Sequence, residues 1–156
     1  MQTVGLTALV EKLKLKNLTP EVDMSDTVIT TPNINRPALQ LAGYFDHFAS
    51  DRVQIIGYVE YTYLKHLTIE QRLPIYERFL SSEIPCVIFS SRTEPDDEFL
   101  KLAVKHNKPL LASDQETSPF MAECIRALST MLAPCISIHG VLVDVYGEGV
   151  LLMGES

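Results

Sequence analysis

The chain has 156 residues, of which 46% are hydrophobic and 21% are charged, and its formal net charge is −7 at pH 7. This composition is typical of a folded globular protein and excludes a largely disordered chain. The negative charge argues against nucleic acid or an anionic membrane surface as a partner, because both require a basic face. No apolar run approaches the roughly 20 residues of a spanning helix, and residues 1–5 do not resemble a signal peptide. We therefore expect a cytoplasmic protein.

The first third of the chain predicts one amphipathic helix and then mostly irregular structure. Apolar residues recur at helical spacing over about residues 4–15. A short β-branched stretch at 22–31 is followed at 32–37 by a predicted loop, which contains two prolines and two asparagines. A short helix over 37–42 is expected to end at Gly43, because helices favour proline at their start and glycine just after their end.

From about residue 53 onward, strands and helices are predicted to alternate. Runs of apolar and β-branched residues at 53–58, 87–89 and 110–112 predict three strands. The helical patterns between and after them indicate βαβ units, which build a mostly parallel sheet flanked by helices. We therefore expect residues 1–131 to form one small α/β domain, and we place a boundary near Pro134, where the alternation stops.

Three helix starts in this region carry recognisable signals. Thr68 and Gln71 match a capping box, and Pro74 is expected to kink or restart that helix. The acidic run 96–98 opens the next helix, where carboxylates suit the helix dipole, although a metal site is the alternative. Ser118 is expected to cap the last helix. The apolar stripe predicted for this helix consists of Met121, Ile125, Leu128 and Leu132.

Two polar or aromatic segments follow predicted strands. The run Ser-Ser-Arg-Thr at 90–93 lies where open α/β sheets bind ligands, and its hydroxyls and arginine could hold an anion. The alternative is a solvated loop that caps the next helix. Tyr58, Tyr61 and Tyr63 follow an earlier strand and form either an interface patch or ordinary packing.

Residues 136–156 predict a β-hairpin that leads into a possible phosphate-binding loop. Two apolar runs flank a turn with two glycines, which supply the positive φ of a tight reversal. Gly154, Glu155 and Ser156 then match the opening of the P-loop pattern G-x-x-x-x-G-K-[ST], whose backbone N–H groups cradle phosphates. The alternative is an ordinary turn with a frayed end. A buried strand rarely finishes a domain on a glycine, so we expect the sequence to be a piece of a longer protein.

His139 is the most specific single residue of this segment. It precedes Gly140, which has no side chain to keep a ligand away from the backbone. A histidine between apolar neighbours is either a satisfied core group or a functional imidazole.

Several segments together resemble the bacterial HPr kinase/phosphorylase family, and the resemblance covers nearly the whole chain. In that family a His-Gly pair opens a hairpin, and the second strand of the hairpin feeds the P-loop. The Gly-Lys-Ser end of that loop is not among the 156 residues. The segments that carry the resemblance are 34–43, 52–57, 84–91, 139–144 and 150–156.

The resemblance implies a parent enzyme that phosphorylates a serine of HPr, the phosphocarrier protein of the sugar phosphotransferase system. Such an enzyme uses ATP or pyrophosphate with Mg²⁺, reverses the reaction by phosphorolysis and controls carbon catabolite repression. Members of the family are homohexamers assembled through the kinase domain.

The resemblance also assigns roles within the chain. Residues 1–131 would be the N-terminal domain, and 132–156 would be the truncated start of the P-loop kinase domain. His139 would act beside the nucleotide phosphates, and Gly154, Glu155 and Ser156 would bind the nucleotide. We expect the 156 residues alone to be inactive. A non-enzymatic regulatory or oligomerisation module is the alternative function.

Overall fold

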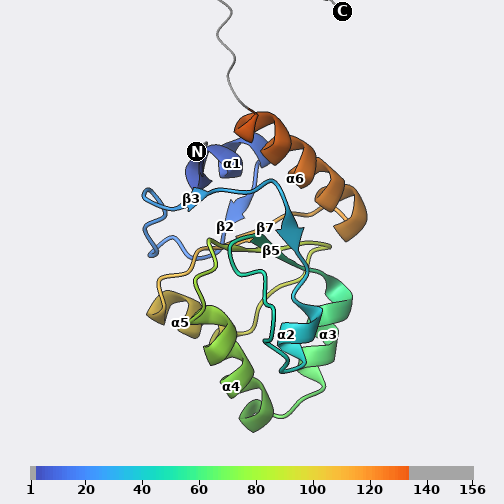
Figure 1. Ribbon diagram of the computed structural model, residues 1–156. Coiled ribbons are helices and arrows are strands. Elements are labelled where there is room, and N and C mark those ends of the chain that lie inside the picture. The colour runs from blue at the N-terminus through green and yellow to red at the C-terminus, as the bar shows by residue number, and fades with distance from the viewer. Residues whose placement is uncertain (1–2, 134–156) are drawn as a thin grey trace, which may run out of the picture.

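The computed structural model describes residues 3–133, which form a three-layer α/β/α arrangement (Figure 1). The central sheet has five strands in the order β2-β7-β6-β5-β4. Four of them pair in parallel, and β2 pairs antiparallel with β7 at one edge. The strands are β2 (Lys16–Asn17), β4 (Ile34–Asn35), β5 (Val53–Ile56), β6 (Val87–Phe89) and β7 (Leu110–Ala112).

Helices cover both faces of this sheet. Helices α2 to α5 lie on one face, and α1 and α6 lie on the other (Figure 1). The chain passes from β4 to β5, β6 and β7 in one direction across the sheet, and right-handed crossovers in one direction place their helices on one face. The helices are α1 (Leu6–Leu13), α2 (Ala38–Leu41), α3 (Tyr58–Lys65), α4 (Ile69–Leu80), α5 (Asp97–Lys105) and α6 (Thr117–Leu132).

Each face of the sheet has its own hydrophobic core. Along β5, Val53 and Ile55 point into the core with α1 and α6, whereas Ile56 points into the core with α2 to α5. The adjoining strand β6 alternates in the same way, with Ile88 on the first side and Phe89 on the second. Burial on both faces explains why these strands are apolar throughout except for the buried Gln54 of β5. The predicted α/β class, a mostly parallel sheet flanked by helices, is confirmed.

A small second sheet joins β1 (Val4–Gly5) and β3 (Val28–Ile29) as an antiparallel pair. Within the predicted β-branched stretch 22–31, only Val28–Ile29 forms a strand. The loop predicted for 32–37 is partly wrong, since β4 lies inside it. β4 is only two residues long, and its parallel pairing with β5 depends on a tertiary contact rather than on local propensity.

The predictions for two further segments, one strand and one helix, are also corrected. The strand predicted for 53–58 ends at Ile56, and Tyr58 opens α3, which the sequence analysis did not anticipate. Helix α4 begins after Thr68 with the predicted capping box, but it continues through Pro74 without restarting. Proline removes one backbone hydrogen bond and its ring crowds the carbonyl four residues earlier, but the packing of Tyr76, Phe79 and Leu80 in the core stabilises the helix against this cost.

Helix α6 starts earlier and faces differently than predicted. It begins at Thr117 after Glu116, so Ser118 lies within the first turn and is not the cap. Ile125 is 40% exposed, whereas the fully buried positions are Phe120, Cys124 and Leu128. The buried stripe is therefore rotated relative to the predicted one, because the aromatic ring and the thiol, rather than Ile125, face the sheet.

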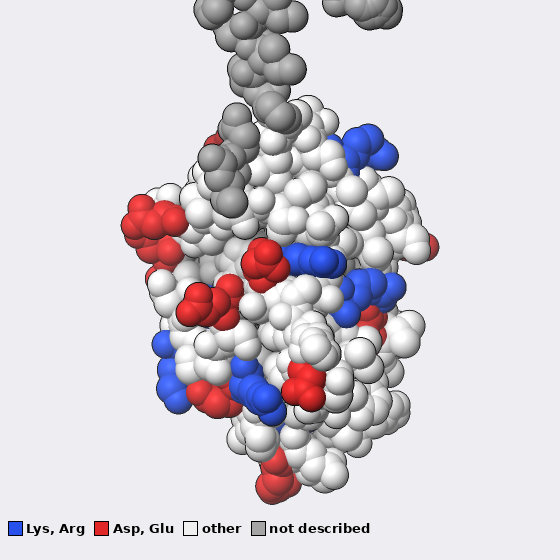
Figure 2. Space-filling model, in the orientation of Figure 1, with Lys and Arg blue, Asp and Glu red and all other residues white. Residues whose placement is uncertain are grey.

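Within residues 3–133, no helix is both long and apolar enough to cross a membrane. Figure 2 shows acidic and basic side chains interspersed over one face of the molecule. The predicted hairpin and the proposed start of a second domain lie outside the described residues.

Candidate functional site

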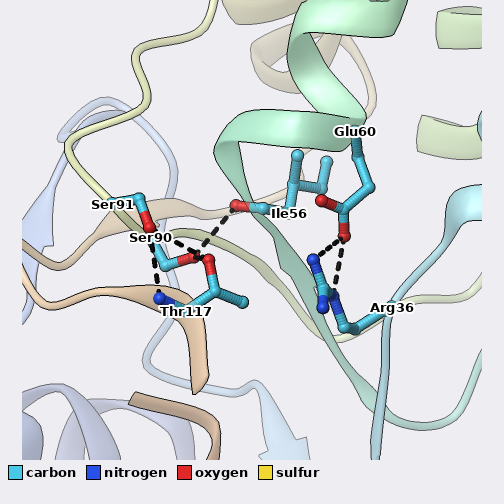
Figure 3. Close-up of polar contacts among 6 residues, drawn as sticks. All are labelled: Arg36, Ile56, Glu60, Ser90, Ser91 and Thr117. Carbon is cyan, nitrogen blue, oxygen red and sulfur yellow. Dashed lines mark hydrogen bonds and ion pairs between the residues drawn. The ribbon is translucent and has the colours of Figure 1, made fainter. Parts of the chain in front are cut away.

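The carboxyl ends of β4, β5 and β6 bring together polar residues that are far apart in the sequence (Figure 3). Arg36 follows β4, and its Nε and Nη2 lie 2.7 and 2.5 Å from Oε2 of Glu60, in the first turn of α3. The other carboxylate oxygen of Glu60, Oε1, is buried and has no hydrogen-bond partner among residues 3–133. This ion pair therefore ties the end of β4 to the start of α3 and leaves one carboxylate oxygen unused.

A cluster of three hydroxyl groups lies beside this ion pair (Figure 3). Oγ1 of Thr117 lies 2.7 Å from Oγ of Ser90 and 3.0 Å from Oγ of Ser91. The backbone N–H of Thr117 also donates to Ser91 Oγ at 3.1 Å. The first N–H groups of a helix lack hydrogen-bond acceptors within the helix. Ser91, in the loop after β6, supplies such an acceptor for the first residue of α6. The hydroxyl cluster thereby fixes the α6 N-terminus against the carboxyl edge of the sheet.

Gly57 lies between the ion pair and the hydroxyl cluster. A Cβ at this position would be 2.6 Å from Thr117 Oγ1, 3.1 Å from Glu60 Oε1 and 3.2 Å from Arg36 Nη2. Its φ of −99° is available to any residue, so space rather than backbone conformation requires glycine here. The two groups can approach each other only because this residue has no side chain.

The loop after β6 has an unusual backbone. Ser91 and Arg92 both have a φ of 56°, in the left-handed region that non-glycine residues rarely adopt. Two hydrogen bonds hold the turn, because Ser91 N–H donates to Gln115 O at 2.7 Å and Thr93 N–H donates to Ser90 O at 3.0 Å. Such strain persists only where the surrounding structure enforces it, and it is concentrated at functional sites.

Three neighbouring hollows open around Arg92. The first, of about 330 Å³, has an apolar side formed by Leu18 and Leu100. The second, of about 360 Å³, lies between this loop and α3 and is lined by Tyr58, Tyr61, Thr62, Lys65, Arg92, Thr93 and Glu94. The third shares Tyr58 and Arg92 with the second. Residues 91–93 thus line these hollows at the carboxyl end of β6, which is where open α/β sheets bind ligands.

Asp96 is the N-cap residue of α5, as predicted for the acidic run that opens this helix, and its partly buried side chain also belongs to a hydrogen-bonded network. Its carboxylate accepts hydrogen bonds from the hydroxyls of Tyr61 and Tyr76, and Arg72 lies 3.9 Å away. Burial, and then the charge of Asp96, raises the pKa of Tyr76 to about 12. Burial and the hydrogen bond to Asp96 also raise the pKa of Tyr61. Both phenols are therefore donors at neutral pH, and they hold the start of α5 against α3 and α4.

Among residues 3–133, no three His, Cys, Asp or Glu side chains lie close enough together to hold a metal ion. The three predicted tyrosines separate by environment: Tyr61 is buried, whereas Tyr58 and Tyr63 are 65% and 47% exposed. His139, Gly154, Glu155 and Ser156 lie outside the described residues. Arg36, Glu60 and Thr117 were not anticipated, because no local motif marks them and only the sheet brings them together.

The fold and the polar carboxyl edge define an α/β domain of the open, mostly parallel type. Residues 4–128 match the family described as HPr Serine kinase N terminus. This match covers most of the sequence, and the chain belongs to that family.

Similar proteins named HPr kinase/phosphorylase support the assignment. Those from Lachnoclostridium phytofermentans and Caldicellulosiruptor bescii are 52% and 46% identical over 100% and 99% of this chain, and the matches cover 50% and 49% of those proteins. The protein from Streptococcus thermophilus strain CNRZ 1066 is 38% identical over 99% of this chain and 50% of its own length. The chain therefore spans about half the length of the curated relatives it matches.

One solved structure has a similar fold. It contains the CBS and DRTGG domains of the regulatory region of Clostridium perfringens pyrophosphatase, complexed with the activator diadenosine tetraphosphate. The TM-score is 0.53 at 15% identity, over 78% of this chain and 45% of that chain. At this identity the likeness shows a shared fold only.

Proposed function

We propose that the chain is the N-terminal half of an HPr kinase/phosphorylase. The observation that carries the proposal is the 52% identity to a protein of that name, which extends over all 156 residues and so beyond the family match at 4–128. The proposed enzyme transfers a phosphoryl group from ATP or pyrophosphate to a serine of HPr and removes it by phosphorolysis. In the cell it would act in the cytoplasm, as a homohexamer, in carbon catabolite repression.

The proposed chemistry relies on residues near the end of the chain. Gly154, Glu155 and Ser156 would begin the P-loop, where backbone N–H groups bind phosphate oxygens. His139 would stabilise charge on the phosphoryl group during transfer. Mg²⁺ bound with ATP would neutralise the developing charge. No glycine of the chain is followed by lysine, so the lysine and the Mg²⁺-binding hydroxyl of the loop would come from the part of the enzyme that these 156 residues do not include.

The described domain supports a second role within the same protein. Residues 3–133 contain two hydrophobic cores and an edge site that does not include the proposed catalytic residues. A regulatory or oligomerisation module, which was the alternative from the sequence, is therefore compatible with a catalytic parent enzyme.

The proposal is tested by phosphoryl transfer to HPr from labelled ATP, using the full-length parent enzyme. We expect transfer by the parent, a loss of at least about 100-fold in His139→Ala, and no transfer by the 156-residue chain. His47→Ala changes an exposed histidine of the described domain and serves as the matched control. Absence of transfer by a folded parent enzyme, or full activity of the 156-residue chain, would contradict the proposal.

A further inference from the structure

We propose that the hollow between α3 and the loop after β6 is a nucleotide-binding site, in which Arg92 and Lys65 hold a phosphate group and Tyr58 stacks on the base. The hollow is lined by residues of both elements. Nothing in the proposed phosphoryl transfer uses it, and its test does not involve HPr.

Two cations without carboxylate partners line this hollow. Within residues 3–133, neither Arg92 nor Lys65 makes an ion pair, whereas Arg36, Arg72 and Lys105 each lie within 4 Å of a carboxylate. The lining includes a single carboxylate, that of Glu94, so the two cations outnumber it. Nζ of Lys65 lies 5.5 Å from the centre of the Tyr61 ring, which keeps its charge near the hollow. A guanidinium beside an ammonium is a pairing that suits a phosphate group.

A buried hydroxyl provides an independent indication of a ligand. Thr93 is only 6% exposed and lines both the first and the second hollow. Its Oγ1 is buried and has no hydrogen-bond partner among the described residues. Leaving a buried hydroxyl without a hydrogen-bond partner is energetically unfavourable. A rotation of the Thr93 side chain toward the hollow would let this hydroxyl donate to a phosphate oxygen bound there.

The backbone of the loop that carries Arg92 is held in an unusual conformation. Arg92 adopts the left-handed conformation with a φ of 56°, and so does Ser91 before it. The turn is held by α6 and by the loop before it, since Thr117 N–H donates to Ser91 Oγ and Ser91 N–H donates to Gln115 O. A strained turn that is braced in this way positions the arginine before a ligand binds, which reduces the entropy lost on binding.

The remaining lining residues favour a nucleotide over a simple phosphate. Tyr58 is 65% exposed and lines the second and third hollows beside Arg92. An exposed aromatic ring next to a phosphate site can stack on a base and so contribute to binding. Glu94 and Asp114 line the adjoining first hollow, where carboxylates can accept hydrogen bonds from ribose hydroxyls.

The site is tested by titrating the 156-residue chain with AMP, ribose 5-phosphate and adenosine, using calorimetry and amide chemical shifts. We expect AMP to bind about 10-fold or more tightly than ribose 5-phosphate, because only AMP can stack on Tyr58. Adenosine should bind more weakly than AMP, because it lacks the phosphate group. Tyr58→Leu should abolish the preference for AMP over ribose 5-phosphate, whereas Tyr44→Leu, an exposed tyrosine that lines none of the three hollows, should preserve it.

Charge and hydroxyl variants test the phosphate subsite. Arg92→Gln should weaken AMP binding about 10-fold or more, and Arg126→Gln, which changes an exposed arginine on α6, should leave it unchanged. Thr93→Val should weaken AMP binding without lowering the urea midpoint of the free protein, because its hydroxyl makes no internal hydrogen bond.

Three results would overturn the proposal. One is the absence of AMP binding at millimolar concentration by the folded wild-type chain. Another is equal affinity for AMP and ribose 5-phosphate, which would remove the role of the base. The third is equal weakening by Arg92→Gln and Arg126→Gln, which would indicate only nonspecific attraction.

Discussion

At the scale of single residues, Gly57 controls how closely the two polar groups at the sheet edge can approach. The ion pair of Arg36 and Glu60 lies on one side of it, and the Thr117 hydroxyl lies on the other. All three residues would be within 3.2 Å of a Cβ added at this position. A methyl group can be accommodated only if these side-chain atoms shift, which disturbs the ion pair and the hydrogen bonds of Thr117.

We therefore expect Gly57→Ala to destabilise the protein by about 1–3 kcal/mol, the usual cost of overpacking a filled site. The urea dependence of unfolding measures the change. Gly5→Ala is the matched control, because the nearest atom to an added Cβ there is 3.9 Å away. Thr117→Ala in the Gly57→Ala background removes the closest clash and should recover part of the loss. An unchanged midpoint in Gly57→Ala would show that the edge is looser than the distances indicate.

Residue patterns predicted local features well and the polar edge poorly. The capping box of Thr68 and Gln71 is encoded within four residues, and the structure contains it. Arg36 and Glu60 are 24 positions apart, and no local sequence pattern pairs them. Their pairing depends on the parallel alignment of β4 with β5. The position of residues 90–93 at the carboxyl end of β6 was predicted, because the place of a loop at a strand end follows from the α/β pattern alone.

At the scale of elements, the contact between α4 and α5 has a titratable component. Oε2 of Glu77 lies 2.6 Å from Nε2 of His106, and Nζ of Lys105 lies 3.6 Å from its other oxygen. Partial burial raises the pKa of Glu77, but the hydrogen bond from His106 and the charges of His106 and Lys105 outweigh it and leave that pKa lowered. A carboxyl group with a lowered folded-state pKa stabilises the folded protein above its unfolded pKa, and this stabilisation is lost as the pH falls through the folded value.

Glu77→Gln should therefore reduce the pH dependence of the free energy of unfolding at acidic pH. We expect the wild-type protein to lose more of its free energy of unfolding than the variant between about pH 5 and about pH 3, around the ordinary glutamate pKa. Urea unfolding at a series of pH values measures both curves. Glu21→Gln, an exposed residue in a loop, should follow the wild-type curve. Parallel curves for wild type and Glu77→Gln would show that this contact does not contribute to acid sensitivity.

Element prediction succeeded where a segment's own sequence determines its structure. Strands β6 and β7 are short apolar runs after prolines, and both were predicted. Helix α3 was missed because its sequence, YVEYTYLK, is rich in aromatic and β-branched residues that favour strands. Its burial of Tyr61 and Leu64 against the sheet overrides that preference.

At the scale of the whole molecule, the described residues form a unit with two cores. One core joins α1, α6 and the sheet, and the other joins α2 to α5 and the opposite face. Helix α6 is the last described element, and it contributes Phe120, Cys124 and Leu128 to the first core. A domain of this size usually folds cooperatively by itself.

We therefore expect a fragment of residues 1–133 to unfold in a single transition, with a urea midpoint close to that of the 156-residue chain. A shorter fragment, 1–116, should not fold, because without α6 the buried positions of β5 and β6 on that face, Ile55 and Ile88 among them, would be exposed to water. Circular dichroism and tryptic digestion during urea titration measure both fragments. A midpoint much lower in 1–133 than in the full chain would show that residues 134–156 are part of this folding unit. That result would move the domain boundary beyond Pro134, and the first core would then extend into the segment that contains His139.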